Sequence, residues 1–172
     1  LEQTSLDFKK KTGHEIVERY GMTETGMNTS NPLQGLRKRG SVGPPIEGVQ
    51  IRARTESGCI SEEGEAGEIE VKGQNVFAGY WKREEHRSQD FTEDGFFRTG
   101  DLGRIDSEGY LFLIGRKKDL IISGGLNVFP KEVELLIDSL TEVKESAVIG
   151  LPHPDFGEQV VAVIVLKETG GL

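Results

Sequence analysis

The chain has 172 residues, of which 35% are hydrophobic, and a formal net charge of −8. This length allows one domain or parts of two, and the hydrophobic fraction is large enough for a packed core, which excludes a compositionally disordered chain. The negative charge argues against nucleic acid or an anionic membrane as a partner, because both attract basic surfaces.

The single cysteine and the two ends of the chain bear on its location. Cys59 cannot form an internal disulfide, so we expect a reducing, cytoplasmic compartment. Its surroundings contain no group that would activate a thiolate, so we assign it no role. No apolar run approaches the ~20 residues of a membrane span. The chain begins with neither Met nor a signal-peptide pattern, and we expect it to be an excerpt of a longer protein.

The first predicted elements are the end of a helix and a short strand. Residues 5–12 are mostly polar and stop at Gly13, which is typical of the C-terminal end of a helix. Residues 15–21 predict a short strand, and residues 22–26 predict a polar loop after it.

From about residue 40 the hydrophobic pattern has a period of two. Residues 49–54 and 68–72 alternate apolar and polar side chains, which predicts half-buried strands with their charges facing outward. Residues 110–114 predict another strand. Short strands joined by Gly-rich turns indicate a small antiparallel sheet or barrel. The charged residues 82–90 favour an exposed helical turn.

The last third of the chain has a different pattern. After a short strand at residues 120–122, Pro130 opens a predicted helix, because proline suits the first helical position. Apolar runs at residues 147–149 and 160–166 predict central strands packed against this helix. The apolar positions that predict one buried stripe on the helix are Val133, Leu136, Ile137 and Leu140. We place a domain boundary at the charged residues 116–119.

Four segments combine glycine, hydroxyl, carboxylate and basic residues between apolar runs. They are residues 20–24 (YGMTE), 98–101 (RTGD), 115–119 (GRKKD) and 123–130 (SGGLNVFP). Alone, each has an ordinary interpretation as a polar turn, a solvated basic turn or a helix-entry loop. An enzyme that activates a carboxylate with ATP needs such groups, to bind ribose and phosphate and to hold Mg²⁺.

Together and in this order, the four segments resemble the later core motifs of the adenylate-forming superfamily: acyl-CoA synthetases, firefly luciferase and peptide-synthetase adenylation domains. The resemblance covers nearly the whole chain. It implies an α/β fold in which residues 1–115 are the end of a large AMP-binding domain with a β-rich subdomain. Residues 116–172 would begin a small α+β domain. The phosphate loop and the C-terminal catalytic lysine would lie outside this chain, so we expect it to be inactive in isolation.

The resemblance also implies a role for each matching residue of the first segment. Tyr20 would lie against the adenine ring of ATP, and Gly21, the flexible glycine of this segment, is a further candidate for nucleotide binding. Thr23 would contact phosphate, and Glu24 would help to hold Mg²⁺. Thr23 and Glu24 are therefore the candidate catalytic residues of this chain.

The later segments receive roles in the same way. Asp101 would bind both ribose hydroxyls with assistance from Arg116. Lys118 matches the hinge position between the large and small domains. Gly124 and Gly125 would line the tunnel for the pantetheine arm of coenzyme A.

A finer resemblance concerns the acid. Residues 18–25 and 27–32 are similar to malonyl-CoA synthetases, which implies an ATP-dependent acid:CoA ligase acting on malonate. The second carboxylate of malonate needs a cation, and Arg19 and Arg37 are candidates, although both also fit surface or packing roles. Met27 fits either a wall of the acyl pocket or simple packing. The alternatives are another acyl-CoA ligase or adenylation domain of the superfamily, or a non-catalytic nucleotide-binding fragment.

Overall fold

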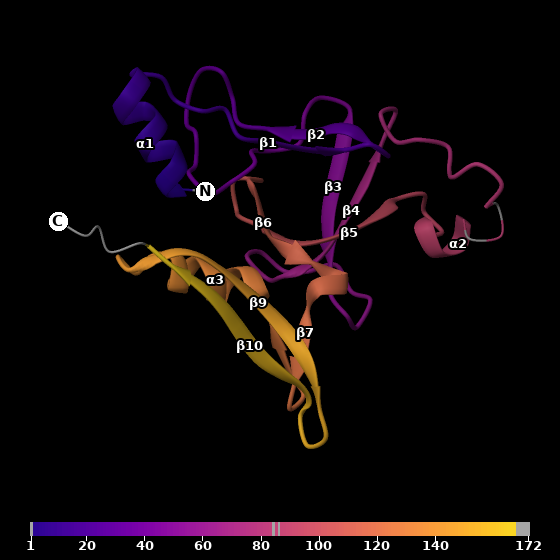
Figure 1. The fold of residues 1–172 in the computed structure, drawn as a ribbon. Coiled ribbons are helices and arrows are strands. Elements are labelled where there is room, and N and C mark those ends of the chain that lie inside the picture. Colours follow the sequence, from indigo (N-terminus) through magenta and orange to yellow (C-terminus); the bar gives the residue numbers. More distant parts are fainter. Residues whose placement is uncertain (1, 84, 86, 168–172) are drawn as a thin grey trace. The chain divides into compact units, whose positions relative to one another are not determined.

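The structure is a computed structural model that describes residues 2–83, 85 and 87–167 (Figure 1). The chain is a strand-rich mixture of helices and sheets, as predicted. It divides into two compact units, Leu1–Leu113 and Ile114–Leu172, which we call the first and second unit. Among the described residues, no helix has both the length and the apolar character needed to cross a membrane.

The first unit begins with helix α1 (Glu2–Thr12). Gly13 has a φ of 75°, and its N–H donates to the carbonyl of Lys9 at 2.8 Å, which confirms the predicted helix end. The strand predicted at residues 15–21 is observed as the shorter β1 (Arg19–Met22). It begins at Arg19 because this residue lies opposite Ser30, the last residue of the strand with which β1 pairs.

That partner is β2 (Gly26–Ser30), so the region predicted as one strand and a loop is an antiparallel β-hairpin. Sequence analysis missed β2, because its residues Asn28, Thr29 and Ser30 are polar. Asn28 and Thr29 are nevertheless fully buried.

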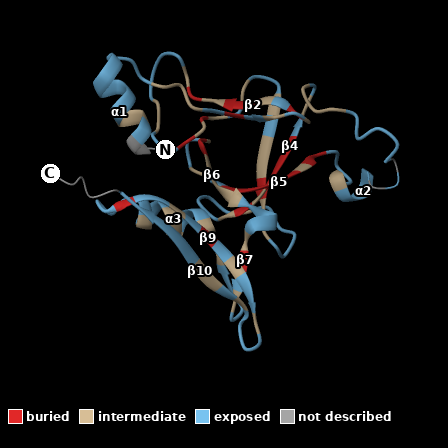
Figure 2. Cartoon of the chain, viewed as in Figure 1, coloured by how far each residue is buried: buried red, intermediate tan, exposed pale blue. Residues whose placement is uncertain are grey.

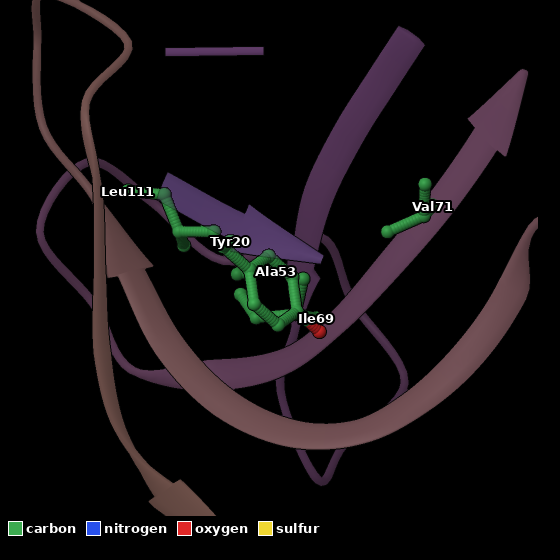
Figure 3. Close-up of a cluster of buried hydrophobic side chains, with 5 residues drawn as sticks. All are labelled: Tyr20, Ala53, Ile69, Val71 and Leu111. Carbon is green, nitrogen blue, oxygen red and sulfur yellow. The ribbon is translucent and has the colours of Figure 1, made fainter. Parts of the chain in front are cut away.

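A four-stranded sheet with the order β3-β4-β5-β6 follows the hairpin, and all of it lies in the first unit except the last three residues of β6, 114–116. Its strands are β3 (Val49–Arg54), β4 (Gly67–Gly73), β5 (Phe97–Ile105) and β6 (Leu111–Arg116). Three of them confirm the strands predicted near residues 49–54, 68–72 and 110–114, whereas β5 was not predicted. The hydrophobic core joins this sheet to the hairpin through Tyr20, Ala53, Ile69, Val71 and Leu111 (Figure 3).

A short helix, α2 (Arg87–Asp90), follows β4 and confirms part of the helical turn predicted for residues 82–90. Residues 84 and 86 of that stretch lie outside the described residues.

The second unit is built on a sheet with the order β8-β7-β10-β9 and on helix α3 (Pro130–Asp138), which packs against β9. Its strands are β7 (Ile121–Ser123), β8 (Leu126–Val128), β9 (Val143–His153) and β10 (Gly157–Leu166). A 3-10 helix, Lys117–Asp119, precedes β7. Proline occupies the start of α3, as predicted.

Two expectations for this unit are wrong. The predicted stripe is not buried: Leu136 is 72% exposed, and Leu140, which lies beyond the end of α3, is 54% exposed. The runs predicted as central strands are largely exposed (Figure 2), and β9 is an edge strand, whereas β10 lies between β7 and β9 as predicted. The reason is length: β7 has three residues and meets β10 at its start, with Gly157 opposite Ser123, so β10 extends beyond β7 while it pairs with β9 along its whole length.

Candidate functional site

The motif at residues 20–24 forms β1 and the tip of the hairpin. Gly21 lies opposite Met27, and a Cβ added to Gly21 would overlap the carbonyl oxygen of Gly26, so glycine alone permits this close approach of the strands. Thr23 and Glu24 occupy the turn that follows. Thr23 is exposed and Glu24 is half-buried. The hairpin therefore carries a hydroxyl and a carboxylate at neighbouring positions of its tip.

Residues 75–80, which follow β4 and are distant in sequence, form hydrogen bonds with this tip. The N–H of Phe77 donates to the carbonyl of Glu24 at 2.8 Å, and Asn75 Nδ2 donates to the carbonyl of Thr25 at 2.7 Å. The hydroxyl of Tyr80 donates to Glu24 Oε1 at 2.8 Å. Burial first, and then the Glu24 carboxylate, raise the pKa of Tyr80 to about 12, so the hydroxyl keeps its proton at neutral pH. Sequence analysis missed these residues, because an Asn-aromatic run after a strand has no distinctive pattern.

Asp101 lies on a bulge of β5. Glu68 is opposite Leu102 and Glu70 is opposite Arg98, so Ile69 alone faces the three residues 99–101 of β5. Gly100 takes a positive φ of 73° at this point. Thr99 fixes the bulge: its Oγ1 donates to the carbonyl of Ile69 at 2.8 Å and accepts the N–H of Asp101 at 3.1 Å. Bulges of this kind re-aim one side chain of a strand.

The bulge brings two predicted site residues together. The hydroxyl of Tyr20 donates to Asp101 Oδ2 at 2.6 Å, although the residues are 81 positions apart in the sequence. Both are buried, Tyr20 to 7% exposure and Asp101 to 6%. The ring of Tyr20 lies in the core cluster (Figure 3). The YGMTE and RTGD motifs therefore meet within the first unit.

The candidate acid-binding residues are arranged differently. Arg37 clamps its own loop, donating from Nε to the carbonyl of Pro32 at 2.9 Å and from Nη2 to that of Leu33 at 2.6 Å. This favours the packing interpretation of Arg37. Arg19 is exposed on β1, and Met27 is half-buried on β2.

The remaining predicted residues belong to the second unit. Arg116 ends β6, and Lys118 lies in the 3-10 helix; both are exposed. Gly124 and Gly125 form the two-residue turn between β7 and β8, with φ values of 59° and 81°. Positive φ at both positions is typical of a type I′ hairpin turn. The two glycines therefore form the turn of a β-hairpin, and the helix-entry loop predicted for this segment is limited to the residues just before Pro130. The pairing of Asp101 with Arg116 stays a prediction.

One buried charge contradicts the sequence pattern. Glu70 was predicted to face outward with the other charges of its strand, yet it is fully buried. Its carboxylate accepts from Arg52 Nε at 2.6 Å and from Arg54 Nε at 2.8 Å, and lies 3.9 Å from Arg98 Nε. Three guanidinium groups replace the water that an outward-facing carboxylate would have, which is why burial is tolerated.

Arg98 links this network to the RTGD motif. It lies opposite Glu70 in the sheet, and its Nη1 donates to the carbonyls of Ser88, Gln89 and Phe91. Arg98 thus holds the segment around α2 against the start of β5, three residues before Asp101.

The fit of a metal can be judged from the donors at the hairpin tip. Among the described residues, no group of three or more His, Cys, Asp or Glu side chains could enclose a metal ion. Mg²⁺ is commonly bound through one or two carboxylates together with substrate phosphates. A single carboxylate, Glu24, beside the hydroxyl of Thr23 fits Mg²⁺ that arrives with a triphosphate.

Comparison with known proteins gives matches along most of the chain. The family described as "AMP-binding enzyme" matches residues 2–81, and "AMP-binding enzyme C-terminal domain" matches residues 132–171. The chain is 41% identical over 157 residues to a malonate-CoA ligase of Arabidopsis thaliana, which covers 91% of the chain and 25% of the relative. It is 40% identical over 163 residues to a sulfoacetate-CoA ligase of Cupriavidus necator, covering 94% and 32%.

A solved structure matches the whole chain. ATP-bound MatB from Rhodopseudomonas palustris is 53% identical, with a TM-score of 0.94, and the match covers 100% of this chain and 34% of that chain. The chain thus spans between a quarter and about a third of the length of these three relatives. Further relatives are named long-chain-fatty-acid-CoA ligases.

Proposed function

Because the chain belongs to the family of AMP-binding, adenylate-forming enzymes, we propose that the protein containing it is an ATP-dependent acid:CoA ligase. The contact between Tyr20 and Asp101 carries this proposal, since it joins two motifs that the family resemblance assigns to one nucleotide. The names of the matched relatives, which are CoA ligases, support the reaction class.

The first unit supplies the nucleotide-binding side chains in this proposal. Asp101 accepts hydrogen bonds from both ribose hydroxyls, and the hydroxyl of Tyr20 holds the carboxylate in place for them. The ring of Tyr20 borders the adenine. Thr23 donates to a phosphate oxygen, and Glu24 binds Mg²⁺. The metal neutralises negative charge on the triphosphate and so favours attack by an anionic acid.

The reaction proceeds in two half-reactions. A carboxylate oxygen of the acid attacks the α-phosphorus of ATP, and the bond to pyrophosphate breaks, which leaves an acyl-adenylate. The sulfur of coenzyme A then attacks the acyl carbon and AMP leaves. We propose Lys118 as the hinge between these steps, Arg116 as a second ribose contact, and Gly124 and Gly125 as the backbone beside the pantetheine arm.

We propose malonate as the acid and the cytoplasm as the compartment. Two relatives are named malonate-CoA ligases, and sulfoacetate, the substrate in the name of another, also carries a second anionic group. Of the two candidate cations, Arg19 suits a second anion better than Arg37, which is engaged with backbone carbonyls. Because other relatives are named long-chain-fatty-acid-CoA ligases, a fatty acid is the alternative substrate.

The test is an exchange assay with the full-length enzyme. Malonate should drive exchange of pyrophosphate into ATP and consumption of CoA, with a higher kcat/KM than acetate, octanoate or palmitate. A monocarboxylate lacks the second anionic group that a cation such as Arg19 would pair with, so we expect it to be used less well. A higher kcat/KM for octanoate or palmitate would contradict the assignment of malonate as the substrate but would leave the ligase activity standing. Failure of every acid to support exchange would overturn the ligase itself.

A further inference from the structure

Tyr80 lies beside the one carboxylate of the hairpin tip, although the two residues are 56 positions apart in the sequence. We infer that Tyr80 is the positioning residue for Glu24: its hydroxyl fixes the orientation in which the carboxylate meets the metal-nucleotide. The inference rests on the role of Glu24 under the proposed function, and it adds a residue that the four motifs do not contain.

The backbone of the tip is already fixed without Tyr80. Phe77 N–H binds the carbonyl of Glu24, and Asn75 Nδ2 binds the carbonyls of Thr25 at 2.7 Å and Met27 at 3.1 Å. What remains free is the Glu24 side chain, which has three rotatable bonds and loses substantial entropy when it is ordered. The Tyr80 hydroxyl, 2.8 Å from Oε1, restricts this freedom.

Tyr80 can act as a rigid support because its own ring is held. The ring packs edge-on against Phe77, with centroids 4.9 Å apart and planes at 78°. Phe77 in turn contacts the rings of Phe91 at 5.9 Å and Phe97 at 5.2 Å. This aromatic cluster connects Tyr80 to β5, the strand that carries Asp101. The carboxylates proposed for metal and ribose are thus supported from the same strand.

The contact differs from a packing contact in what its loss would do. Tyr80 is 39% exposed, so removing its hydroxyl leaves no buried cavity. Tyr110 provides the matched case: its hydroxyl donates to the carbonyl of Leu36 at 2.8 Å, and its ring is buried. The hydroxyls of Tyr80 and Tyr110 each donate a hydrogen bond within the first unit, but only Tyr80 donates to a proposed site residue, Glu24.

The experiment compares Tyr80→Phe with Tyr110→Phe in the full-length enzyme. For Tyr80→Phe, the affinity for Mn²⁺ in the presence of ATP, measured by water-proton relaxation, should fall about threefold to tenfold, as expected for one hydrogen bond. The Mg²⁺ concentration that gives half-maximal pyrophosphate exchange should rise by the same factor, while KM for the acid stays constant. Tyr110→Phe should leave both metal constants unchanged.

A metal-free measurement and a double-mutant cycle complete the test. Without metal or nucleotide, NMR relaxation of the Glu24 side-chain carbons should show more motion in Tyr80→Phe than in Tyr110→Phe, while amide hydrogen exchange at residues 23–25 should be the same in both, because the backbone of the tip is held by Asn75 and Phe77. In a Glu24→Gln background, Tyr80→Phe should cause little further loss of Mn²⁺ affinity, because both substitutions act through one carboxylate. Additive losses would overturn the inference.

The outcomes also separate this inference from the function on which it rests. If Glu24→Gln weakens Mn²⁺ binding and Tyr80→Phe does not, the positioning role is wrong and the metal role of Glu24 stands. If Glu24→Gln leaves Mn²⁺ affinity and exchange unchanged, Glu24 is not a metal ligand and both fall.

Discussion

The two units hold their motif residues in opposite ways. In the first unit, Tyr20 and Asp101 are buried, bonded to each other, and supported by a core and a bulged strand. In the second unit, Lys118, Gly124 and Gly125 are exposed on a 3-10 helix and a tight turn. The comparison indicates that the residues proposed to bind the nucleotide are held in place by the fold itself. The residues assigned to the hinge and to coenzyme A lie where backbone conformation can change.

The ion pairs of the two units also differ in burial, with the more buried pairs in the first unit. The first unit buries Glu70 among three arginines, whereas the described Lys131–Glu134 pair of the second unit spans one turn of α3, with the lysine side chain half exposed. Buried charges that are fully partnered make a region intolerant of change, while exposed pairs contribute little. We therefore expect substitutions in the first unit to change the stability of the fold or the affinity for ATP. Substitutions in the second unit should instead change how readily the proposed hinge alters its backbone conformation.

The largest effect should come from the proposed hinge. Proline at position 118 fixes φ near −65° and restricts Lys117, so the segment can no longer change conformation between half-reactions. In the full-length enzyme, Lys118→Pro should reduce thioester formation by orders of magnitude, while pyrophosphate exchange persists. Both rates are measured on one preparation. Equal losses in the two would show that Lys118 is a turn residue and no hinge.

The next effect tests the buried network. Glu70→Gln keeps the shape of the side chain but removes the charge shared by Arg52, Arg54 and Arg98. Breaking a buried pair costs about 3–5 kcal/mol, and since the arginines are partly exposed we expect about 2–4 kcal/mol of lost stability. Urea unfolding followed by circular dichroism measures it. Lys131→Ala is the control and should change stability far less; a similar loss in both would remove the distinction between the units.

A smaller, functional effect is expected at Asp101. Charge-assisted hydrogen bonds contribute about 1.5–3 kcal/mol, so Asp101→Ala in the full-length enzyme should lower kcat/KM for ATP by roughly 10- to 150-fold. Asp106→Ala is the control: Asp106 lies just after β5 and pairs with Lys38 at 2.6 Å, apart from the proposed ribose contacts. Unchanged kinetics for ATP in Asp101→Ala would remove Asp101 from the site.

Regular patterns predicted much of the fold. Period-two alternation located β3 and β4, and Gly13 marked the end of α1. Prediction failed where local geometry departs from the period. β5 was missed because its bulge places Gly100 at positive φ and interrupts the alternation. Hydrophobic pattern also shows which side of an element is apolar without showing whether anything covers it, which is why the stripe on α3 was misjudged.

Motif residues were easier to identify than their supports. Tyr20, Glu24 and Asp101 were named from the sequence because they stand in recognisable segments. Tyr80 and Glu70 were not, because their importance depends on partners 56 residues away in one case and on neighbouring strands in the other. Cross-strand register cannot be read from one strand alone, and it decides whether a carboxylate faces water or three guanidinium groups.

The smallest effect concerns two glycines that serve different needs. At Gly125 a Cβ would meet nothing within 4 Å, so Gly125→Ala should cost only the strain of φ near 81°, about 1 kcal/mol. Gly21 has no such freedom, because its Cβ would overlap the carbonyl oxygen of Gly26 on the paired strand, and relief requires moving the hairpin tip. We expect Gly21→Ala to destabilise the protein by more, about 1–3 kcal/mol, and to impair ATP use with it. Urea unfolding and KM for ATP, measured for both variants, decide the matter. If Gly125→Ala raised KM for ATP as much as Gly21→Ala did, nucleotide binding could not be assigned to the first unit alone.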